Sequence, residues 1–517
     1  MVRDPLPLIG QPVWEEVLFD YTFANSYGKP AVTQYVPPDV PFTNVVLKLE
    51  GSASGVQFDR LGHFFLGGNE LWRTSTPEPG GDTVTWNALK DVSHALCLFK
   101  ESNNMSYYLG NLVNDVYDAP IHIKLTAEFY FAPETEGLMA DSIVPLTAQN
   151  AHIPILSYSG NESVLVAENL TVAKNVSHLY ISIIASGNAQ EEFWWTNSCP
   201  VKGNPLSSST SSFREVQLIL RKKDGTEYLL LYIWPRPVVF TGGIVPSLWR
   251  PIVSISAFDI YASDFDISAW LPLLWDGADL YVRVISDNKM SGVEADWLLS
   301  ASLGYVHGHE YGVEWDQALS LSLSGTHPLT MEYSTVIENN SKDLLETVNV
   351  AKRRLWVQSL VQDTKGNLYT LELDQEHFAR TAHRLSQKKS TLLTHETKVI
   401  SGSNSYTRSK DGIVAVESLV PHLSFHHDIS LDMQVVEEDS RLVSVYADIK
   451  RIETLHNAHT DLWTEQEGVG RYFANPEGGP GRGFATTHQK YSSDGDGGEY
   501  WRDILAVNGT IVHDYES

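Results

Sequence analysis

The residues best equipped for chemistry lie together in residues 55–79, GVQFDRLGHFFLGGNELWRTSTPEP. Within twenty positions this stretch holds three carboxylic acids and two arginines: Asp59, Arg60, Glu70, Arg73 and Glu78. An aspartate can polarise a water molecule or an amide nitrogen, a second carboxylate can hold the water or a sugar, and an arginine can bind a carbonyl oxygen. Trp72 adds an aromatic face suited to the apolar side of a sugar ring.

Two strands and a tight turn are predicted to position these side chains. Apolar residues alternate along residues 56–66, Gly67-Gly68 supplies the turn, and residues 69–74 return as the second strand. Neighbours on a strand point to opposite faces, so we expect either Asp59 or Arg60 to face a groove or a covered surface. An ordinary hairpin with a solvated charged face is the alternative interpretation.

Five blocks of the sequence, in order, resemble the acid peptide:N-glycanases of the PNGase A family, which are distantly similar to the bacterial enzyme PNGase F. The first block is FDRLGHFFLGGNELWRTSTPEP, and the others are YLGNLV (108–113), EEFWW (191–195), FREVQL (213–218) and FTGGIVPSLWRPI (240–252). Enzymes of this family hydrolyse the side-chain amide that joins an N-glycan to asparagine. The resemblance implies that activity, with N-glycosylated peptides or glycoproteins as partners.

The resemblance also implies which residues act. Asp59 matches the aspartate of the FDR block, and PNGase F has a similar aspartate–arginine pair in its primary catalytic position, so Asp59 is expected to be the essential carboxylate. Glu192 is expected to be the second, with Glu191 and Glu215 as rivals. PNGase F has a Glu-x-Trp pair where this chain has residues 110–112, Gly-Asn-Leu, so no third acid is carried across.

A larger group is expected to bind substrate or line the cleft. For Trp72, packing in the core is an equal alternative to stacking on a sugar, and Arg250 could instead be a strut between domains. The expected substrate-binding residues are Arg60, Glu70, Trp72, Arg73, Glu78, Glu191, Trp194, Glu215, Trp249 and Arg250.

Composition limits the class of protein. The 517 residues are 42% hydrophobic, enough for a packed core, and carry a net charge of −27. Such an acidic chain repels phosphate backbones and anionic membranes, so nucleic acid is not an expected partner. No run reaches the ~20 apolar residues of a membrane span, and the N-terminus has no apolar segment of signal-peptide length. Six Asn-x-Ser/Thr sites permit secretion, so we expect a secreted or vacuolar protein given without its signal.

The two cysteines, Cys97 and Cys199, are too few for a disulfide scaffold or a four-cysteine zinc site. They could form one bridge, which is favoured if the protein is secreted, or be two buried thiols. His94 could pair with Cys97, but flanking leucines favour a buried structural thiol. Histidines 422, 426 and 427 are better explained as surface residues than as metal ligands. We therefore expect neither a metal nor another cofactor.

Frequent short strands with regular turn signals predict an all-β protein. Two adjacent β-sandwich or jelly-roll domains are expected, over residues 1–132 and 143–290, followed by a mainly β region over 291–517. Short helices are expected at 91–100 and 376–387. The catalytic blocks occur in both sandwiches, so the site is expected in the cleft between them.

Two other functions remain open on the sequence. An endoglycosidase that cuts within the core chitobiose would also use paired carboxylates. A non-catalytic glycan-binding protein would need only the aromatic part of the site. The mass of the peptide product separates these functions from amide hydrolysis, because only amide hydrolysis converts asparagine to aspartate.

Overall fold

The computed structural model describes residues 10–131, 139–147, 152–307, 313–323, 328–336, 343–388, 390–415, 423–439, 441–456, 460–473, 482–493 and 499–517. Nearly all regular structure is antiparallel β-sheet, which confirms the predicted all-β class. The two α-helices described are single turns, α1 (Leu96–Phe99) and α2 (Leu271–Leu274). In the part of the chain that is described, no helix has the length and apolar character to cross a membrane.

The first sandwich packs two four-stranded sheets, ordered β1-β8-β3-β6 and β2-β7-β4-β5. Alternate apolar residues of each sheet fill the space between them, such as Leu47 and Leu125 from one sheet and Phe64 and Tyr107 from the other. The strands are β1 (Trp14–Phe23), β2 (Ala31–Tyr35), β3 (Asn44–Val56), β4 (Leu61–Leu66), β5 (Asn69–Ser75), β6 (Gly80–Asp91), β7 (Asn103–Leu109) and β8 (Ile121–Tyr130).

The second sandwich combines a sheet ordered β10-β17-β12-β15, with β9 also paired to β17, and a sheet ordered β11-β16-β13-β14. Strand β17 lies after residue 290, the expected end of this domain, yet it pairs with β12 along its length. We therefore propose a domain boundary after His307. The strands are β9 (Ser142–Pro145), β10 (Leu156–Gly160), β11 (Val164–Leu170), β12 (Val176–Gly187), β13 (Glu215–Arg221), β14 (Glu227–Ile233), β15 (Ser263–Asp266), β16 (Ala278–Ile285) and β17 (Val293–His307).

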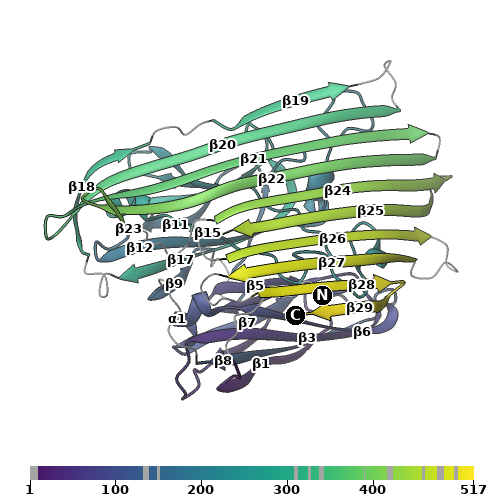
Figure 1. Cartoon of the computed structure of the whole chain (residues 1–517), viewed down its shortest axis with the longest axis horizontal. Coiled ribbons are helices and arrows are strands. Elements are labelled where there is room, and N and C mark those ends of the chain that lie inside the picture. The colour runs from purple at the N-terminus through teal and green to yellow at the C-terminus, as the bar shows by residue number, and fades with distance from the viewer. Residues whose placement is uncertain are drawn as a thin grey trace.

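The C-terminal region is a twelve-stranded sheet with the main order β18-β20-β21-β22-β24-β25-β26-β27-β28-β29, in which β19 pairs with β20 and β23 with β22. Figure 1 shows its long strands side by side across the molecule. They are β18 (Trp315–Ser322), β19 (Thr330–Val336), β20 (Leu344–Asp363), β21 (Leu368–Lys388), β22 (Thr391–Lys410), β23 (Ile413–Ala415), β24 (Leu423–Glu438), β25 (Arg441–His456), β26 (Thr460–Phe473), β27 (Arg482–Ser493), β28 (Glu499–Val507) and β29 (Thr510–Glu516).

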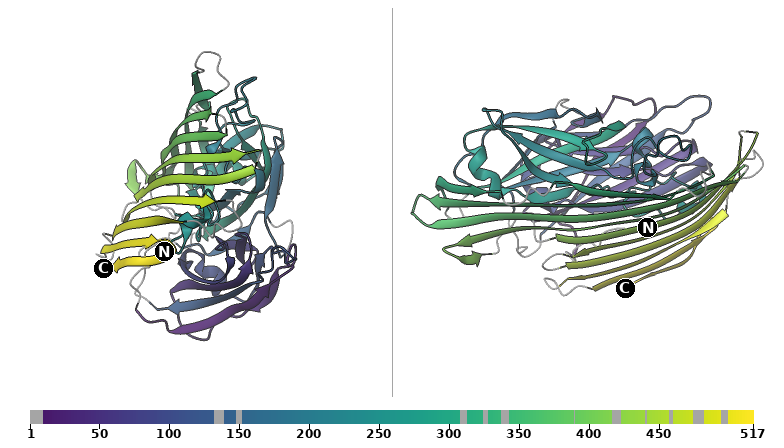
Figure 2. Two further views of the ribbon diagram at one scale, coloured as in Figure 1. Left: turned by 90° about the vertical axis from the view of Figure 1, so that its right-hand side faces the viewer. Right: turned by 90° about the horizontal axis from the view of Figure 1, so that it is seen from above.

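One face of this sheet supports the rest of the molecule. Both views of Figure 2 show the two sandwiches on the same side of it. Alternate residues of its strands, among them Leu355, Leu371, Ile400 and Ile429, are buried in the same apolar core as the second sandwich. The sheet and the second sandwich are therefore one packing unit.

The helix expected at 376–387 is wrong, because that stretch lies inside strand β21. Strands β20 and β22 pair with β21 along almost its whole length, and buried and partly exposed residues alternate there. Tertiary pairing has overridden the local helical pattern. The helix expected at 91–100 is reduced to one turn of 3₁₀-helix, Ser93–Ala95, followed by α1.

The disulfide that secretion would favour is absent, since Cys97 and Cys199 are both free thiols. Cys97 packs against the core of the first sandwich. Cys199 is buried in the second, where its backbone N–H donates to Thr347 of the C-terminal sheet. The sequence could not exclude a bridge, because the relative position of the two sandwiches was unknown. Of the candidate surface histidines, His427 is buried and His426 exposed, and His422 lies outside the described residues.

Aromatic rings cover glycines that stand directly opposite them in the sheets. Gly51 pairs with Trp86, and Gly304 pairs with Tyr180. A Cβ atom on Gly304 would stand 1.7 Å from the Tyr180 ring, so the ring fits here only because glycine has no side chain. Tyr180 lies on β12 of the second sandwich but packs in the apolar core of the first. This glycine–tyrosine pair therefore joins the two sandwiches.

We predict that Gly304→Ala destabilises the protein by about 1–3 kcal/mol, the usual cost of overpacking a core. The added methyl group displaces Tyr180 and loosens the contact between sandwiches. Thermal unfolding measures the change, with Ser320→Ala on the exposed part of β18 as the control. An unchanged melting temperature for Gly304→Ala would show that Tyr180 is not needed in this position.

Candidate active site

A cleft of about 390 Å³ lies between the two sandwiches. It holds both expected catalytic residues, Asp59 from the first sandwich and Glu192 from the second. The residues that line it are Tyr27, Asp59, Arg60, Leu61, His63, Ser75, Tyr108, Gly110, Asn188, Ala189, Glu192, Phe240, Asp296 and Leu298. Neither sandwich alone makes this cleft.

Asp59 and Arg60 do not lie on a strand as expected, but in the connection of residues 57–60 between β3 and β4. Gln57 fixes this connection. Its buried side-chain amide donates to the backbone oxygens of Leu112 (2.9 Å) and Ala119 (3.2 Å), while its Oε1 accepts from the Arg60 guanidinium at 2.6 Å. Freed from strand geometry, Asp59 and Arg60 can both line the cleft.

Gly242 supports Asp59 from the second sandwich. Its backbone N–H donates to Asp59 Oδ2 at 3.3 Å. A Cβ at this position would lie 3.2 Å from Asp59 Oδ1 and only 2.0 Å from Glu78 Oε2, so both carboxyl groups crowd one point of the backbone. Glu78 is not a lining residue of the cleft, and lies beside Asp59 as a third acid. The FTGG block therefore has a glycine at position 242 because a larger residue would leave no room for the carboxyl groups of Asp59 and Glu78.

The large C-terminal sheet holds the segment that carries Gly242. Arg451 on β25 donates to the backbone oxygens of Pro237 (3.0 Å) and Ile255 (2.9 Å). Gln466 on β26 accepts from the Ile255 N–H at 2.7 Å. These contacts fix residues 237–255 at both ends, so the third region of the chain positions part of the site.

Burial raises the pKa of three carboxyl groups at the cleft, and for two of them the charge of a neighbouring acid adds to the rise. Burial, followed by the charges of Asp59 and Glu78, raises the pKa of Glu192 to about 7. Burial and the charge of Asp59 also raise the pKa of Glu78 to about 7, against the opposing effect of Arg250. Burial raises the pKa of Asp59 too, but the Gly242 N–H and the charge of Arg60 oppose that rise. Of the three acids, Asp59 is the one whose charged form is supported by both a hydrogen-bond donor and an arginine.

Arg60 and Arg250 are the cations whose charges oppose the raised pKa values of Asp59 and Glu78 respectively. Arg60 donates to the Tyr27 hydroxyl at 2.8 Å, and its guanidinium lies over the Tyr27 ring. Arg250 donates to the backbone carbonyl of Glu78 across the boundary between the sandwiches. Arg250 is thus a strut between domains, one of the two roles considered for it, and Arg60 can reach a substrate.

Seven of the expected substrate-binding residues are buried outside the cleft, contrary to expectation. Glu70 forms an ion pair with Arg73, Glu191 with Arg214, and Glu215 with Arg353. The three tryptophans donate their indole N–H groups inward or pack in the core, with exposures of 3% or less. The residues concerned are Glu70, Trp72, Arg73, Glu191, Trp194, Glu215 and Trp249. Glu191 and Glu215 therefore cannot replace Glu192 as the second carboxylate of the cleft.

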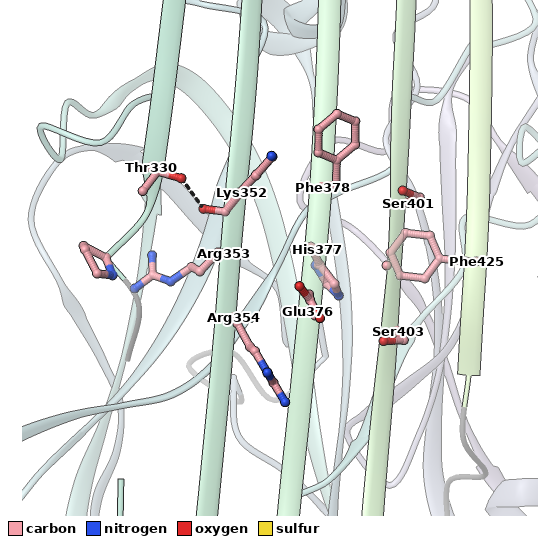
Figure 3. A pocket seen from close by; sticks show the side chains of 12 residues that line it. Thr330, Lys352, Arg353, Arg354, Glu376, His377, Phe378, Ser401, Ser403 and Phe425 are labelled. Atoms are coloured by element: carbon pink, nitrogen blue, oxygen red, sulfur yellow. Dashed lines mark hydrogen bonds between the residues drawn. The ribbon is translucent and has the colours of Figure 1, made fainter. Parts of the chain in front are cut away.

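A roomier hollow of about 720 Å³ lies on the C-terminal sheet, across strands β20, β21 and β22 (Figure 3). Its side chains include Lys352, Arg354, Glu376 and Phe378. Lys352 lies over the Phe378 ring, and Arg354 is paired with Asp374. Glu376 is the one acid among its described lining residues, whereas the smaller cleft brings several acids together and is the stronger candidate site.

Sequence reasoning missed His63, which lines the cleft, and did not identify Glu78 as a third acid beside Asp59. His63 lies within the FDR block but looked like one residue of an apolar strand. Residue type and spacing do not show that the cleft between the two sandwiches reaches this side chain. Among the described residues, no three His, Cys, Asp or Glu side chains are placed to hold a metal ion.

Comparison with known proteins gives the family. The model of the family described as peptide N-acetyl-β-D-glucosaminyl asparaginase amidase A matches residues 7–317. A relative from Prunus dulcis, peptide-N4-(N-acetyl-β-glucosaminyl)asparagine amidase A, is 25% identical over 99% of this chain and 91% of its own. Among solved structures, PNGase F, a glycosylasparaginase from Flavobacterium meningosepticum, matches with a TM-score of 0.35 and 13% identity, covering 57% of this chain and 96% of that one.

The family match spans both sandwiches, and therefore every residue that lines the cleft and all three acids of its carboxyl cluster. The chain belongs to the peptide N-acetyl-β-D-glucosaminyl asparaginase amidase A family.

Proposed function

We propose that this protein hydrolyses the amide bond between an N-linked glycan and its asparagine, with Asp59 and Glu192 as the catalytic pair. The observation that carries the assignment is the group of three acids with raised pKa values at a cleft built jointly by the two sandwiches that the family model covers. Amide hydrolysis needs a base for water and an acid for the departing amine. Acids whose environments set different protonation states can fill both roles.

Asp59 is suited to act as the base. The Gly242 N–H and the nearby Arg60 favour its charged form. As a carboxylate it takes a proton from water while the water oxygen attacks the side-chain carbonyl carbon of asparagine. Arg60, which lines the same cleft, is suited to hold the carbonyl oxygen as negative charge develops there.

Glu192 is suited to act as the acid. Its pKa of about 7 leaves it protonated in acidic solution, and no cation opposes that rise. It gives its proton to the glycosyl nitrogen as the carbon–nitrogen bond breaks, which leaves aspartate in the peptide and the sugar as its 1-amino derivative. Glu78 has a similar pKa of about 7, so near that pH its growing negative charge helps Glu192 to retain its proton.

The natural environment we propose is extracellular or vacuolar and acidic. The asparagines of five possible glycosylation sites are exposed, at positions 104, 161, 169, 175 and 508, while Asn339 lies outside the described residues. Exposure is what attachment of a glycan would require. A protonated Glu192 likewise suits acidic surroundings.

We predict that the wild-type protein converts the glycosylated asparagine of a glycopeptide to aspartate, and that Asp59→Asn lowers kcat by at least the 10²–10⁴-fold typical of general acid–base groups. The substitution keeps size and hydrogen bonding, so glycopeptide binding stays nearly intact. Mass spectrometry of the peptide gives the product, and calorimetry gives binding. Retention of one sugar on asparagine would establish an endoglycosidase, and an unchanged peptide a binding protein. A rate above a tenth of wild type would make Asp59 structural.

We predict a bell-shaped dependence of activity on pH. Activity rises as Asp59 loses its proton and falls near pH 7 as Glu192 loses its own. Glu78 also loses its proton near pH 7, so Glu78→Gln removes a neighbour that becomes negative there. The substitution lowers the pKa of Glu192 and moves the alkaline limb to lower pH. Glu168→Gln on the exposed part of β11 is the control and leaves both limbs in place. A limb that stays fixed in Glu78→Gln would show that Glu78 does not affect the catalytic acid.

We predict that chelators and thiol alkylation leave activity unchanged. Burial raises the pKa of both thiols to about 11, so each is protonated and a poor nucleophile. Turnover is measured after treatment with EDTA and, separately, with iodoacetamide. Loss with EDTA that a divalent ion restores would require a metal in the mechanism. Loss on alkylation would direct attention to Cys97 or Cys199.

A further inference from the structure

His63 lines the cleft together with Asp59 and Glu192, but the proposed reaction gives it no role. It lies on strand β4, immediately after the connection that carries Asp59, and its side chain is only 2% exposed. Its ring stacks with Phe65 on one strand and with Tyr108 on the neighbouring strand β7. A buried ring held in this way has little freedom to turn.

One nitrogen of this ring is fixed by a buried carboxylate. His63 Nδ1 lies 2.7 Å from Glu70 Oε1. Glu70 is held in turn by Arg73, at 3.0 Å from Nε to Oε1 and 2.7 Å from a terminal nitrogen to Oε2, and by the Ser300 hydroxyl from the second sandwich. Burial would raise the pKa of Glu70, but Arg73 and His63 outweigh it and hold that pKa well below its usual range. Glu70 is therefore an acceptor.

The other nitrogen, Nε2, is left as an acceptor. Burial lowers the pKa of His63, with Arg73 adding to the effect and Glu70 opposing it, which favours the neutral ring. Since Glu70 can only accept, the single ring proton lies on Nδ1. Within the described residues, Nε2 has no hydrogen-bond partner, and it is not one of the atoms sealed from solvent. Because the ring lines the cleft, Nε2 presents its lone pair there.

A neutral acceptor suits this position. Asp59, Glu192 and Asp296 line the cleft, and Glu78 lies beside Asp59. A further anion there would raise the pKa values of Glu78 and Glu192 more. Imidazole accepts a hydrogen bond without adding charge. Its natural partner is therefore an uncharged O–H or N–H group rather than a cation. The sugar attached to asparagine offers such donors in its hydroxyl groups and its acetamido N–H.

We propose that His63 is a specificity-determining residue, whose Nε2 accepts a hydrogen bond from a donor on the asparagine-linked sugar. The proposal rests on the proposed function, because it takes the sugar of a glycosylated asparagine as the ligand. Arg73 and Glu70 act through His63 as positioning residues. This gives the buried Glu70–Arg73 pair a part in recognition although neither side chain reaches the cleft.

The test measures binding in an Asp59→Asn background, where turnover does not interfere. The ligand is a glycopeptide with a single N-acetylglucosamine on asparagine. His63→Asn keeps a donor for Glu70 but does not reach the position of Nε2, whereas His63→Gln restores a polar atom there. We expect about tenfold weaker binding for the Asn variant, as for loss of one hydrogen bond, and a smaller loss for Gln. His122→Phe, on the exposed side of β8, is the control and leaves Kd unchanged.

Deoxygenated ligands identify the donor. Glycopeptides whose sugar lacks the 3-hydroxyl, the 6-hydroxyl or the acetamido N–H are compared in the Asp59→Asn protein with and without His63→Asn. The proposal requires that one of these losses weakens binding only when His63 is present. Equal Kd values with and without His63→Asn, or additive effects for all three ligands, would overturn it, as would failure to bind the glycopeptide.

The outcome is separable from that of the proposed function. Product analysis of the wild-type protein tests hydrolysis, while Kd values test recognition by His63. Thermal unfolding of each variant shows that it is folded. Should His63→Asn unfold, His63→Phe carries the same comparison, because it keeps the stacked ring and removes both nitrogens.

Discussion

The buried ion pair between Glu70 and Arg73 is the interaction on which the site depends. Arg73 is fully buried and also donates to Ser186 and to the backbone of Leu298, both in the second sandwich, at 2.9 and 2.8 Å. The pair thereby joins the sandwiches at the wall of the cleft. Removing one partner of such a pair typically costs ~3–5 kcal/mol, because the other charge stays buried without compensation. The cleft geometry is tied to the stability of the whole domain interface.

The acids at the cleft make the stability of the fold depend on pH. Asp59, Glu78 and Glu192 all have raised pKa values, so folding favours their protonated forms. For each group the folded protein binds more protons than the unfolded chain between the ordinary pKa and the raised one. Their contribution to stability is therefore greatest in acid, and that of Glu78 and Glu192 is lost as pH rises through about 7.

The C-terminal sheet has a structural role that its sequence did not reveal. Its inner face shares a core with the second sandwich, and Arg451 and Gln466 hold the segment that carries Gly242. A backbone N–H can support Asp59 only if that segment is fixed. The long strands provide a rigid base for this purpose, far from the cleft in sequence but connected to it by direct hydrogen bonds.

The sequence by itself determined the all-β class and the family, and it proposed Asp59 and Glu192, which both line the cleft. These follow from local signals, namely alternation of apolar residues and blocks such as FDR and EEFWW. Tertiary structure alone decided which polar residues face the cleft. Glu191 and Glu192 are neighbours, yet one is buried against Arg214 and the other lines the cleft. Burial depends on what the second sandwich and the large sheet bring to each side chain, and residue type and spacing do not contain that information.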